Sequence, residues 1–313
     1  MNTSAQTTST PGWMRRAWDS DLAYSFRRSK VTVVAGLVTL MYICFALFAP
    51  WIAPHDPYDL ANLSLLDAFT PPAWTEDGSR EFLLGTDNLG RDVLSTIIYG
   101  SRISLGVGLL SIFIAASIGV SLGLISGYVG GKTDAVIMRI AEIQLSFPDI
   151  LIALLIDGTI RSFVGPEVHE EIAFVVVVSA ISLSYWVQYA RTVRGAAMVE
   201  KNKEYIQAAR VIGKNPIYIM IRHLLPNVMG PVLVIATISL ALAIITEATL
   251  SFLGVGIPPT QPSLGTLIRI GNDFLFSGEW WIAIFPGAAL AIMGLSVNLL
   301  GDWLRDALNP KLR

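Results

Sequence analysis

Residues 201–226 have the sequence KNKEYIQAARVIGKNPIYIMIRHLLP, a polar stretch between two long apolar runs. Its first part places apolar side chains at the helical spacing i, i+3, i+4 and i+7: Tyr205, Ala208, Ala209 and Ile212. This spacing predicts a short helix with one narrow apolar stripe. Such a helix is typical either of a membrane surface or of a site that docks another protein.

Three further signals divide this stretch. Gly213 is expected to end the first helix, because glycine readily adopts the left-handed conformation found at helix ends. Asn215 followed by Pro216 predicts the N-cap and the first residue of a second short helix. Pro226 should stop that second helix, since proline disfavours helical geometry in the residue before it.

The composition of the 313-residue chain is typical of a membrane protein. Hydrophobic residues make up 53% of the chain, charged residues 15%, and the mean hydropathy is +0.58. A helix that spans a bilayer needs about 20 apolar residues. Six segments meet this requirement: residues 32–53, 103–128, 135–156, 172–190, 228–252 and 282–301. The predicted fold class is therefore an all-α polytopic membrane protein, whose first span is an uncleaved anchor.

The positive charges predict the orientation of these six spans. If the N-terminus lies inside, 17 of the 22 lysines and arginines also lie inside, and the five outside are Arg80, Arg91, Arg102, Arg161 and Arg269. The positive-inside rule then predicts that both termini lie in the cytoplasm. The polar stretch at 201–226 is expected to face the cytoplasm as well.

The sequence as a whole predicts that the chain is organised in five parts. Apolar residues recur every four positions near the N-terminus, which predicts a helix in the membrane interface: Met14, Trp18, Leu22 and Phe26. The proline-rich segment after the first span is too polar to cross a membrane and should form a small external cap. The predicted parts are a disordered cytoplasmic tail (1–12), the interfacial helix (13–30), the first transmembrane helix (31–53), a periplasmic segment (54–102) and a core of five transmembrane helices (103–308) that includes the loop 191–227.

The second span carries small residues at four-residue spacing: Ala115, Gly119, Gly123 and Gly127. Small residues let two helices approach closely, so this face predicts helix packing and not ligand binding.

The sequence contains no strong motif for a nucleotide-binding, metal or catalytic site. The sequence GYVGGKT at 127–133 ends like a phosphate-binding loop, but Ser126 stands where such a loop requires its first glycine. The three histidines lack the spacing of a metal site, and the single cysteine, Cys44, excludes an intramolecular disulfide. We therefore expect no enzyme activity, no cofactor, no metal and no nucleic-acid partner, and an energy source in another subunit.

Polar side chains inside apolar spans are functional candidates, because it is costly to place them in lipid. Glu142 and Gln144 precede a kink expected at Pro148 in the third span. They could line a translocation path or bind a substrate amine, although Glu142 could equally stabilise a helix contact. Glu247 in the fifth span is a third path candidate, for which a structural pairing role is favoured.

Several of these segments resemble one family of transporters. Gln207, Ala208, Ala209 and Gly213, followed by HLLPN at 223–227, resemble the cytoplasmic EAA loop of permease subunits in binding-protein-dependent ABC importers. Three more segments are similar to the C-type subunit of dipeptide and oligopeptide (peptide/nickel) permeases: LGTD at 84–87 with GRD at 90–92, EATLSFLGVG at 247–256, and NLLGDWLRDALNP at 298–310. Gln207 stands where the family usually has glutamate, which removes a charge from the loop.

The resemblance implies a type I importer half in a bacterial inner membrane, with six spanning helices and an N-terminal interfacial helix. It implies a homologous B-type permease, two ABC ATPase subunits that hydrolyse ATP, and a periplasmic or lipid-anchored solute-binding protein. One ATPase would dock on the loop through Tyr205, Ile206, Gln207, Ala208, Ala209, Arg210, Ile212 and Gly213. Replacing Ala209 or Gly213 by a bulky charged residue is then expected to uncouple transport without loss of membrane insertion.

The resemblance also implies di- or oligopeptides as the substrate. Relatives with the same machinery import nickel chelates, glutathione, opines or oligosaccharides, and the sequence does not choose among these. A gradient-driven secondary transporter is less expected, because the inverted repeats common in that class are not evident in the sequence.

Overall fold

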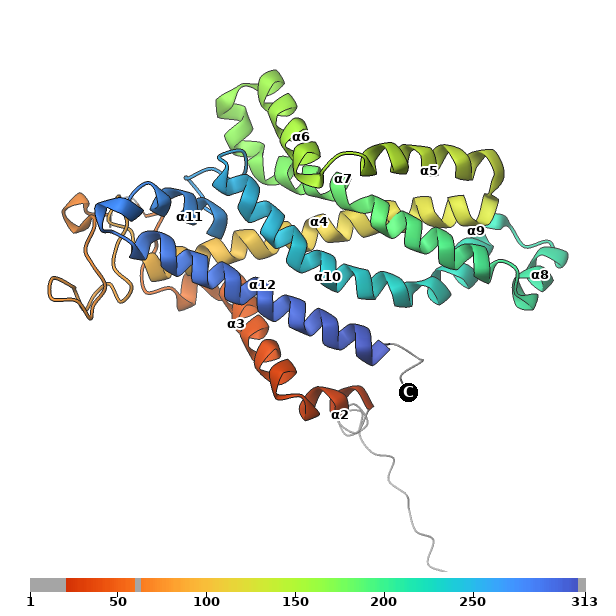
Figure 1. The fold of residues 1–313 in the computed structure, drawn as a ribbon, viewed down its shortest axis with the longest axis horizontal. Helices are drawn as coiled ribbons and strands as arrows, with labels where there is room; N and C mark the ends of the chain where they lie inside the picture. The colour runs from red at the N-terminus through yellow and green to blue at the C-terminus, as the bar shows by residue number, and fades with distance from the viewer. Residues whose placement is uncertain (1–20, 60–62, 309–313) are drawn as a thin grey trace, which may run out of the picture.

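The computed structural model describes residues 21–59 and 63–308 as an elongated bundle of helices (Figure 1). In chain order the helices are α2 (Asp21–Arg28), α3 (Lys30–Ile52), α4 (Val93–Val129), α5 (Gly131–Leu145), α6 (Asp149–Val164), α7 (Pro166–Glu200), α8 (Glu204–Val211), α9 (Pro216–Ile219), α10 (Leu225–Phe252), α11 (Leu264–Asn272) and α12 (Trp281–Leu308). Short 3₁₀ turns lie at Leu65–Asp67 and Leu275–Ser277. The α8 and α9 helices lie at one end of the bundle, and α11 lies at the other with the loops of residues 53–92.

Most of the predicted spans are present as long apolar helices. Within the described residues, five helices are long and apolar enough to cross a membrane, and the bent pair α5 and α6 would make a sixth span. The second span begins at Val93 and not near residue 103, because Asp92 caps the helix there: its carboxylate accepts a hydrogen bond of 2.9 Å from the backbone N–H of Ser95.

The third span differs from the prediction. One kinked helix over 135–156 was expected, but α5 and α6 are separate helices that meet at 92°. Pro148 lies between them with φ −58° and ψ 134°, an extended conformation that ends the regular hydrogen bonding of the helix. Proline also disfavours helical geometry at Phe147. The chain therefore turns a corner at residues 146–148 instead of bending gently.

The expected stop at Pro226 is also wrong. From Pro216 the chain is helical without a break to Phe252, through a π-helical turn at Met220–Leu224. Pro226 lies in the first turn after this π-helical turn, at the start of α10. A proline lacks a backbone N–H, and a first-turn position does not require one, so the proline is tolerated there.

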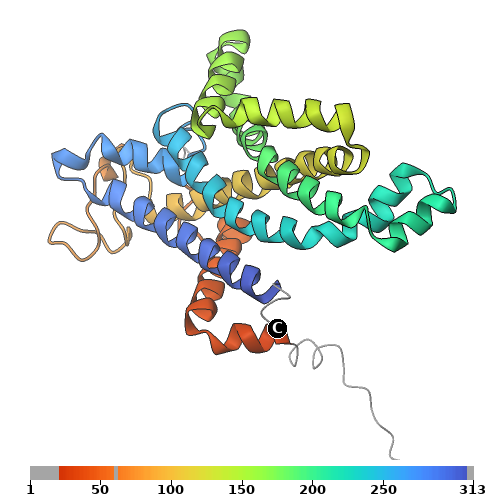
Figure 2. The ribbon, with the colours of Figure 1, turned by 45° about the vertical axis from the view of Figure 1, so that its right-hand side comes forward.

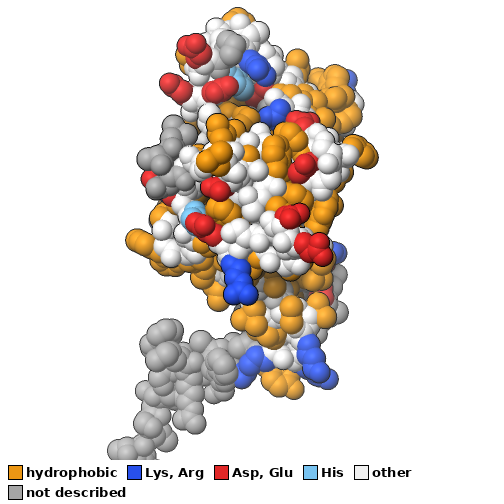
Figure 3. Space-filling model, turned by 90° about the vertical axis from the view of Figure 1, so that its left-hand side faces the viewer, with side chains coloured by type: hydrophobic (Ala, Val, Ile, Leu, Met, Phe, Trp, Pro, Cys, Tyr) orange, Lys and Arg blue, Asp and Glu red, His pale blue; other side chains and the backbone are white. Residues whose placement is uncertain are grey.

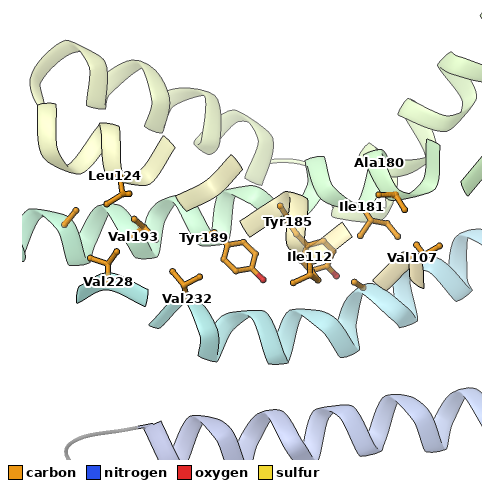
Figure 4. Close-up of a cluster of buried hydrophobic side chains, with 14 of the residues drawn as sticks. Val107, Ile112, Leu124, Ala180, Ile181, Tyr185, Tyr189, Val193, Val228 and Val232 are labelled. Carbon is orange, nitrogen blue, oxygen red and sulfur yellow. The ribbon is translucent and has the colours of Figure 1, made fainter. Parts of the chain in front are cut away.

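The small-residue face of α4 packs directly against α7, as predicted. A Cβ atom built on Gly119 would lie 2.4 Å from the carbonyl oxygen of Trp186, and one on Gly123 would lie 2.6 Å from that of Ala190. Both are closer than any side chain can approach. The apolar core follows the same contact: Figure 4 shows side chains of α4, α7 and α10, including Tyr189, that point into one shared cluster.

The described residues between α3 and α4, 53–59 and 63–92, fold onto the ends of the spanning helices. Asp87 and Arg91 form a buried ion pair with an Oδ2 to Nε distance of 2.6 Å, and the indole N–H of Trp281 donates to the Thr86 carbonyl at 3.0 Å. The ion pair lies within the segment, and the hydrogen bond from Trp281 joins the segment to α12. Figure 3 looks onto this end of the molecule, where carboxylates are spread among apolar side chains.

The segment predicted as an N-terminal interfacial helix is described only in part. Residues 1–20, with the predicted tail, Met14 and Trp18, lie outside the described residues. The described part, α2, runs back beneath the C-terminal end of α12 (Figure 2). There the ring of Phe26 packs edge-to-face on Trp303, with 5.1 Å between centroids.

Candidate functional site

The loop between α7 and α10 has the predicted helix, glycine turn and second helix. Gly213 has φ +78°, and two hydrogen bonds close the end of α8: Gly213 N–H to Arg210 O at 2.9 Å, and Lys214 N–H to Ala209 O at 3.1 Å. This pattern is a Schellman motif, which requires the left-handed conformation that glycine adopts without strain. The side chain of Asn215 caps α9 by accepting from the N–H of Ile217 at 2.9 Å. The loop is therefore an ordered structure with a defined exit angle.

The expected apolar stripe of α8 is divided between two faces. Ile206 is fully buried and Ala209 is 7% exposed, and both join the core cluster with Leu224. Ile212 lies beyond the last turn of α8 and is 73% exposed. Tyr205 is partly exposed. The inner face of α8, with Ile206 and Ala209, thus belongs to the core of this chain, although only Ala209 was part of the stripe drawn from spacing.

Polar contacts join the loop to three spanning helices. The Arg210 guanidinium lies 4.8 Å from the centroid of the Tyr128 ring at the end of α4. The Lys201 ammonium donates to the Gly127 carbonyl of the same helix at 2.7 Å. The hydroxyl of Tyr205 donates to the carboxylate of Glu200 at the end of α7, and it accepts a hydrogen bond from Asn227 Nδ2 of α10.

The hydroxyl of Tyr205 is held as a donor by its surroundings. Burial and the neighbouring Glu200 carboxylate raise the pKa of Tyr205 to about 12. The tyrosine therefore stays protonated at physiological pH and keeps donating to Glu200. Direct contacts therefore link the loop to the ends of α4, α7 and α10.

The outer surface of the loop is apolar and exposed. We define the exposed loop face as five large side chains: Val211 (88% exposed), Ile212 (73%), Ile217 (60%), Ile221 (59%) and Tyr218 (45%). Only Ile212 was a candidate from the sequence. The others fall outside the predicted stripe, because Val211 is off its spacing and Ile217, Tyr218 and Ile221 follow the Gly213 turn. Gln207, Ala208 and Arg210 are also exposed.

The polar candidates of the third span have different surroundings. The carboxylate of Glu142 is 65% exposed and lies 3.4 Å from Arg139 on the same helix. Gln144 is engaged by α7: its amide nitrogen donates to the Leu183 carbonyl at 2.5 Å, and its amide oxygen accepts from the indole N–H of Trp186 at 2.8 Å. Gln144 thus holds the end of α5 against α7 beside the corner.

Glu247 is fully buried and does not share a contact with the candidates on α5. Its two carboxylate oxygens accept from Ser104 at 2.8 Å and from Ser251 at 2.7 Å. Ser104 also accepts from the backbone N–H of Leu264, so the carboxylate connects α4, α10 and the start of α11. This geometry matches a structural pairing role more closely than a path-lining one.

One ion pair near the loop was missed from the sequence. Asp134 at the start of α5 accepts from Arg194 of α7 at 2.5 Å and 2.7 Å, in a bidentate arrangement. Ser126 of α4 donates to the same carboxylate at 2.5 Å. A separation of 60 residues gives no local signal, so only the packed helices bring these groups together.

Two family models match the chain. Residues 119–313, more than half of the chain, match the family described as the binding-protein-dependent transport system inner membrane component. Residues 13–72 match the N-terminal transmembrane domain of oligopeptide transport permease C. The chain belongs to the family of inner-membrane components of binding-protein-dependent transport systems. It is a multi-pass inner-membrane transport component, and its membership, inferred from its motifs, in the C-type permeases of peptide ABC importers is confirmed.

The permease is similar over nearly its whole length to curated relatives. It is 39% identical to the di/tripeptide transport system permease protein DppC of Pseudomonas aeruginosa, over 97% of this chain and 94% of the relative. It is 41% identical to the dipeptide transport system permease protein DppC of Escherichia coli K12, over 92% and 91% of the two chains. It is 38% identical to the dipeptide transport system permease protein DppC of Haemophilus influenzae, over 93% of this chain and 94% of the relative.

The fold of the permease is similar to that of a solved ABC importer. Two inward-facing structures of the MetNI methionine ABC transporter match with TM-scores of 0.52 and 0.53 and sequence identities of 20% and 22%. Each match covers 68% of this chain and 96% of the solved chain. The predicted type I importer fold is therefore confirmed, and this likeness concerns the fold alone.

Proposed function

We propose that the permease forms half of the transmembrane path of a peptide importer and is driven by ATPase subunits that dock on the exposed loop face. The proposed assembly contains a homologous B-type permease, two ABC ATPases and a solute-binding protein. Both termini and the loop lie in the cytoplasm. The observation that carries the proposal is the loop itself: an exposed apolar surface on a helix whose opposite face is packed into the bundle.

The geometry of the loop suits the transmission of force. A groove on a partner can bury the apolar side chains of a short helix, as in other helix-in-groove complexes. Ile206 is buried in the core cluster that α4, α7 and α10 also form, so a movement of the helix would disturb the packing of the spans. Closure of the ATPase pair would then change the packing of the spans, which is the kind of two-state motion that alternating access requires.

The docking surface can be tested with Ile212→Glu. The side chain is 73% exposed, so the charge should leave folding and membrane insertion unchanged while it disrupts an apolar contact. We expect loss of ATPase subunits from the purified complex and at least a tenfold loss of ATP-driven uptake in proteoliposomes. The conservative change Ile212→Val should retain both. A matched control is Leu66→Glu, which places the same charge on a 96% exposed side chain at the opposite end; it should retain the ATPases. Retention of the ATPases by Ile212→Glu would refute the docking proposal.

The structure shows that Ala209 and Gly213 are poor positions at which to test coupling by mutation. Ala209 is buried in the core and Gly213 needs its positive φ, so a bulky charge at either position would distort the loop before it touched a partner. Loss of transport in those variants would not separate docking from folding. Among the path candidates, we propose that Glu142 remains available to a substrate, whereas Gln144 and Glu247 hold helices together.

The proposed peptide substrate rests on the names of the relatives and is tested by uptake. The complex is reconstituted into vesicles together with its solute-binding protein. It should accumulate a labelled dipeptide only when ATP is present on the side of the membrane that carries the loop. Accumulation that follows an ion gradient without ATP would support a secondary transporter instead.

The orientation can be tested with single cysteines. Cys44 is replaced by alanine, and a cysteine is placed at exposed Gln207 or at exposed Asp77. A membrane-impermeant thiol reagent added to spheroplasts should label the position at 77 and not the position at 207. The reverse pattern would overturn the proposed topology.

A further inference from the structure

Two adjoining cavities are lined by side chains of α4, α6, α7 and α11 and by the segment 253–263 that joins α10 to α11. The smaller cavity has a volume of about 170 Å³ and the larger one of about 410 Å³. They share three lining residues, Glu170, Ile257 and Pro258, so they lie side by side. We call the smaller cavity the basic pocket and the larger one the acidic pocket, after the charged side chains that line them.

The basic pocket is lined by two arginines from different helices. Arg161 of α6 is exposed, whereas Arg269 of α11 is partly buried with its guanidinium against Gly254: a Cβ atom built on that glycine would lie 3.3 Å from Nη1. Among the described residues, neither arginine forms an ion pair. A guanidinium stays charged at physiological pH, and its planar donors match the two oxygens of a carboxylate. Two such groups on one small cavity indicate a carboxylate ligand.

The other titratable groups beside the basic pocket leave these arginines available. His169 of α7 also lines it, and its Nε2 lies 3.0 Å from Oδ1 of Asp157 on α6. Asp157 is buried and does not line the pocket, so its carboxylate is engaged with the histidine. Among the described residues that line the basic pocket, Glu170 is the one acid. Two arginines against one glutamate leave the lining with a net positive charge.

The acidic pocket carries the opposite charge. It is lined by Glu167, Glu170 and Glu171 of α7, all of which are exposed, and by Thr260 and Gln261, whereas none of its described lining residues is basic. These carboxylates repel a ligand that carries negative charge alone, such as the acidic surface of a protein. They attract a ligand whose positive group lies a few ångströms from its carboxylate. A short peptide with free ends has this distribution of charge.

We propose that the basic pocket binds the free C-terminal carboxylate of a peptide, with Arg161 and Arg269 as the donors. The positive end of the same peptide points toward the glutamates of the acidic pocket. This inference rests on the proposed function, from which it takes the peptide as substrate. The volume of the basic pocket corresponds to about six water molecules at ~30 Å³ each, enough for a carboxylate and the atoms next to it. In the proposed orientation both pockets lie on the outer side, where the peptide arrives.

The test measures binding to the assembled importer in nanodiscs, without the solute-binding protein. Radiolabelled alanyl-alanine is compared with alanyl-alanine amide, which lacks the carboxylate, and bound ligand is measured by equilibrium dialysis. We expect the wild type to bind the dipeptide at least tenfold more tightly than the amide. Arg161→Gln and Arg269→Gln should each weaken binding of the dipeptide about tenfold, the effect of losing a hydrogen bond to a charged group. Both variants should bind the amide like the wild type.

The matched control is Arg80→Gln, which removes the same charge from an exposed arginine that lines neither pocket. This variant should bind the dipeptide like the wild type. Because Arg161 is exposed, Arg161→Gln should fold even if Arg269→Gln does not. Equal affinity of the wild type for the dipeptide and its amide, or unchanged affinity for the dipeptide in Arg161→Gln, would overturn the proposal.

Two further results separate this inference from its alternatives. If the arginine variants bind the dipeptide normally but associate less tightly with the solute-binding protein, the pocket takes a carboxylate of that protein and the proposal is wrong. Uptake by the wild type tests the proposed function separately. A wild type that imports the dipeptide yet binds it no better than the amide refutes this inference alone. A wild type that prefers the dipeptide in the binding assay and does not import it refutes the proposed function alone.

Discussion

The contact between α4 and α7 can be tested by adding a single methyl group, in the variant Gly123→Ala. The new Cβ would lie 2.6 Å from the Ala190 carbonyl oxygen and 2.9 Å from Val193 Cβ, whereas ordinary contacts begin at 3.4 Å. Both neighbours are backbone or Cβ atoms that cannot rotate away, so the helices must separate by somewhat less than 1 Å. A gap of this size forfeits about a quarter to a half of the dispersion energy of each contact along the interface.

The expected cost is about 1–3 kcal/mol, the usual range for overpacking in a close-packed core. For domains of about 150–250 residues, 1 kcal/mol corresponds to roughly 2–4 °C in melting temperature, and the shift is smaller for a longer chain such as this one. We therefore expect the apparent melting temperature of the permease in detergent, followed by tryptophan fluorescence, to fall by several degrees. Gly119→Ala should behave in the same way, because its Cβ would lie 2.4 Å from the Trp186 carbonyl oxygen.

The matched control is Gly195→Ala in α7, the partner helix, where an added Cβ would have no neighbour within 4 Å. There the better helix propensity of alanine should be neutral or stabilising by up to about 1 kcal/mol. The reasoning fails if Gly123→Ala and Gly195→Ala melt within 1 °C of each other at matched detergent and protein concentrations.

Three further predictions concern the polar contacts. Glu247→Leu should leave serine hydroxyls without an acceptor at a cost of about 1–3 kcal/mol for each, and Glu247→Gln should cost less; melting temperatures compare the two, and an equal loss would contradict the pairing role. Tyr205→Phe removes the donor to Glu200 and should cost about 1 kcal/mol locally, seen as faster proteolysis of the loop at an unchanged global melting temperature. Arg194→Gln and Asp134→Asn should each destabilise the permease by about 1 kcal/mol, and the double variant should cost less than the sum of the two; strict additivity in this cycle would show that the two side chains do not interact.

Some features of the loop were predictable because their causes are local. The helix ending at Gly213 and the cap at Asn215 depend on a few consecutive residues, and both are present as predicted. The small-residue face of α4 was predictable for the same reason, since its four-residue spacing is visible without a partner. Pro226 shows the limit of a local rule: proline can end a helix or begin one, and the π-helical turn before it decided the outcome.

Other features depend on which helix lies opposite. Spacing predicted an apolar stripe on α8 but could not say that Ile206 and Ala209 face the core while Ile212 faces outward. The partners of Gln144 on α7 also could not be predicted, because they lie about 40 residues away in the sequence. Nor could the 92° angle between α5 and α6 at Pro148.

The sequence alone determined that this chain is a bundle of membrane-spanning helices with an ordered polar loop, because hydropathy, charge asymmetry and turn residues act over short distances. Its motifs also identified the family. Only the tertiary structure decided which side chains of the loop are exposed and that Glu247 is enclosed by serines. These outcomes arise from close packing between segments far apart in the chain, where the position of each side chain depends on the neighbour that fills the remaining space.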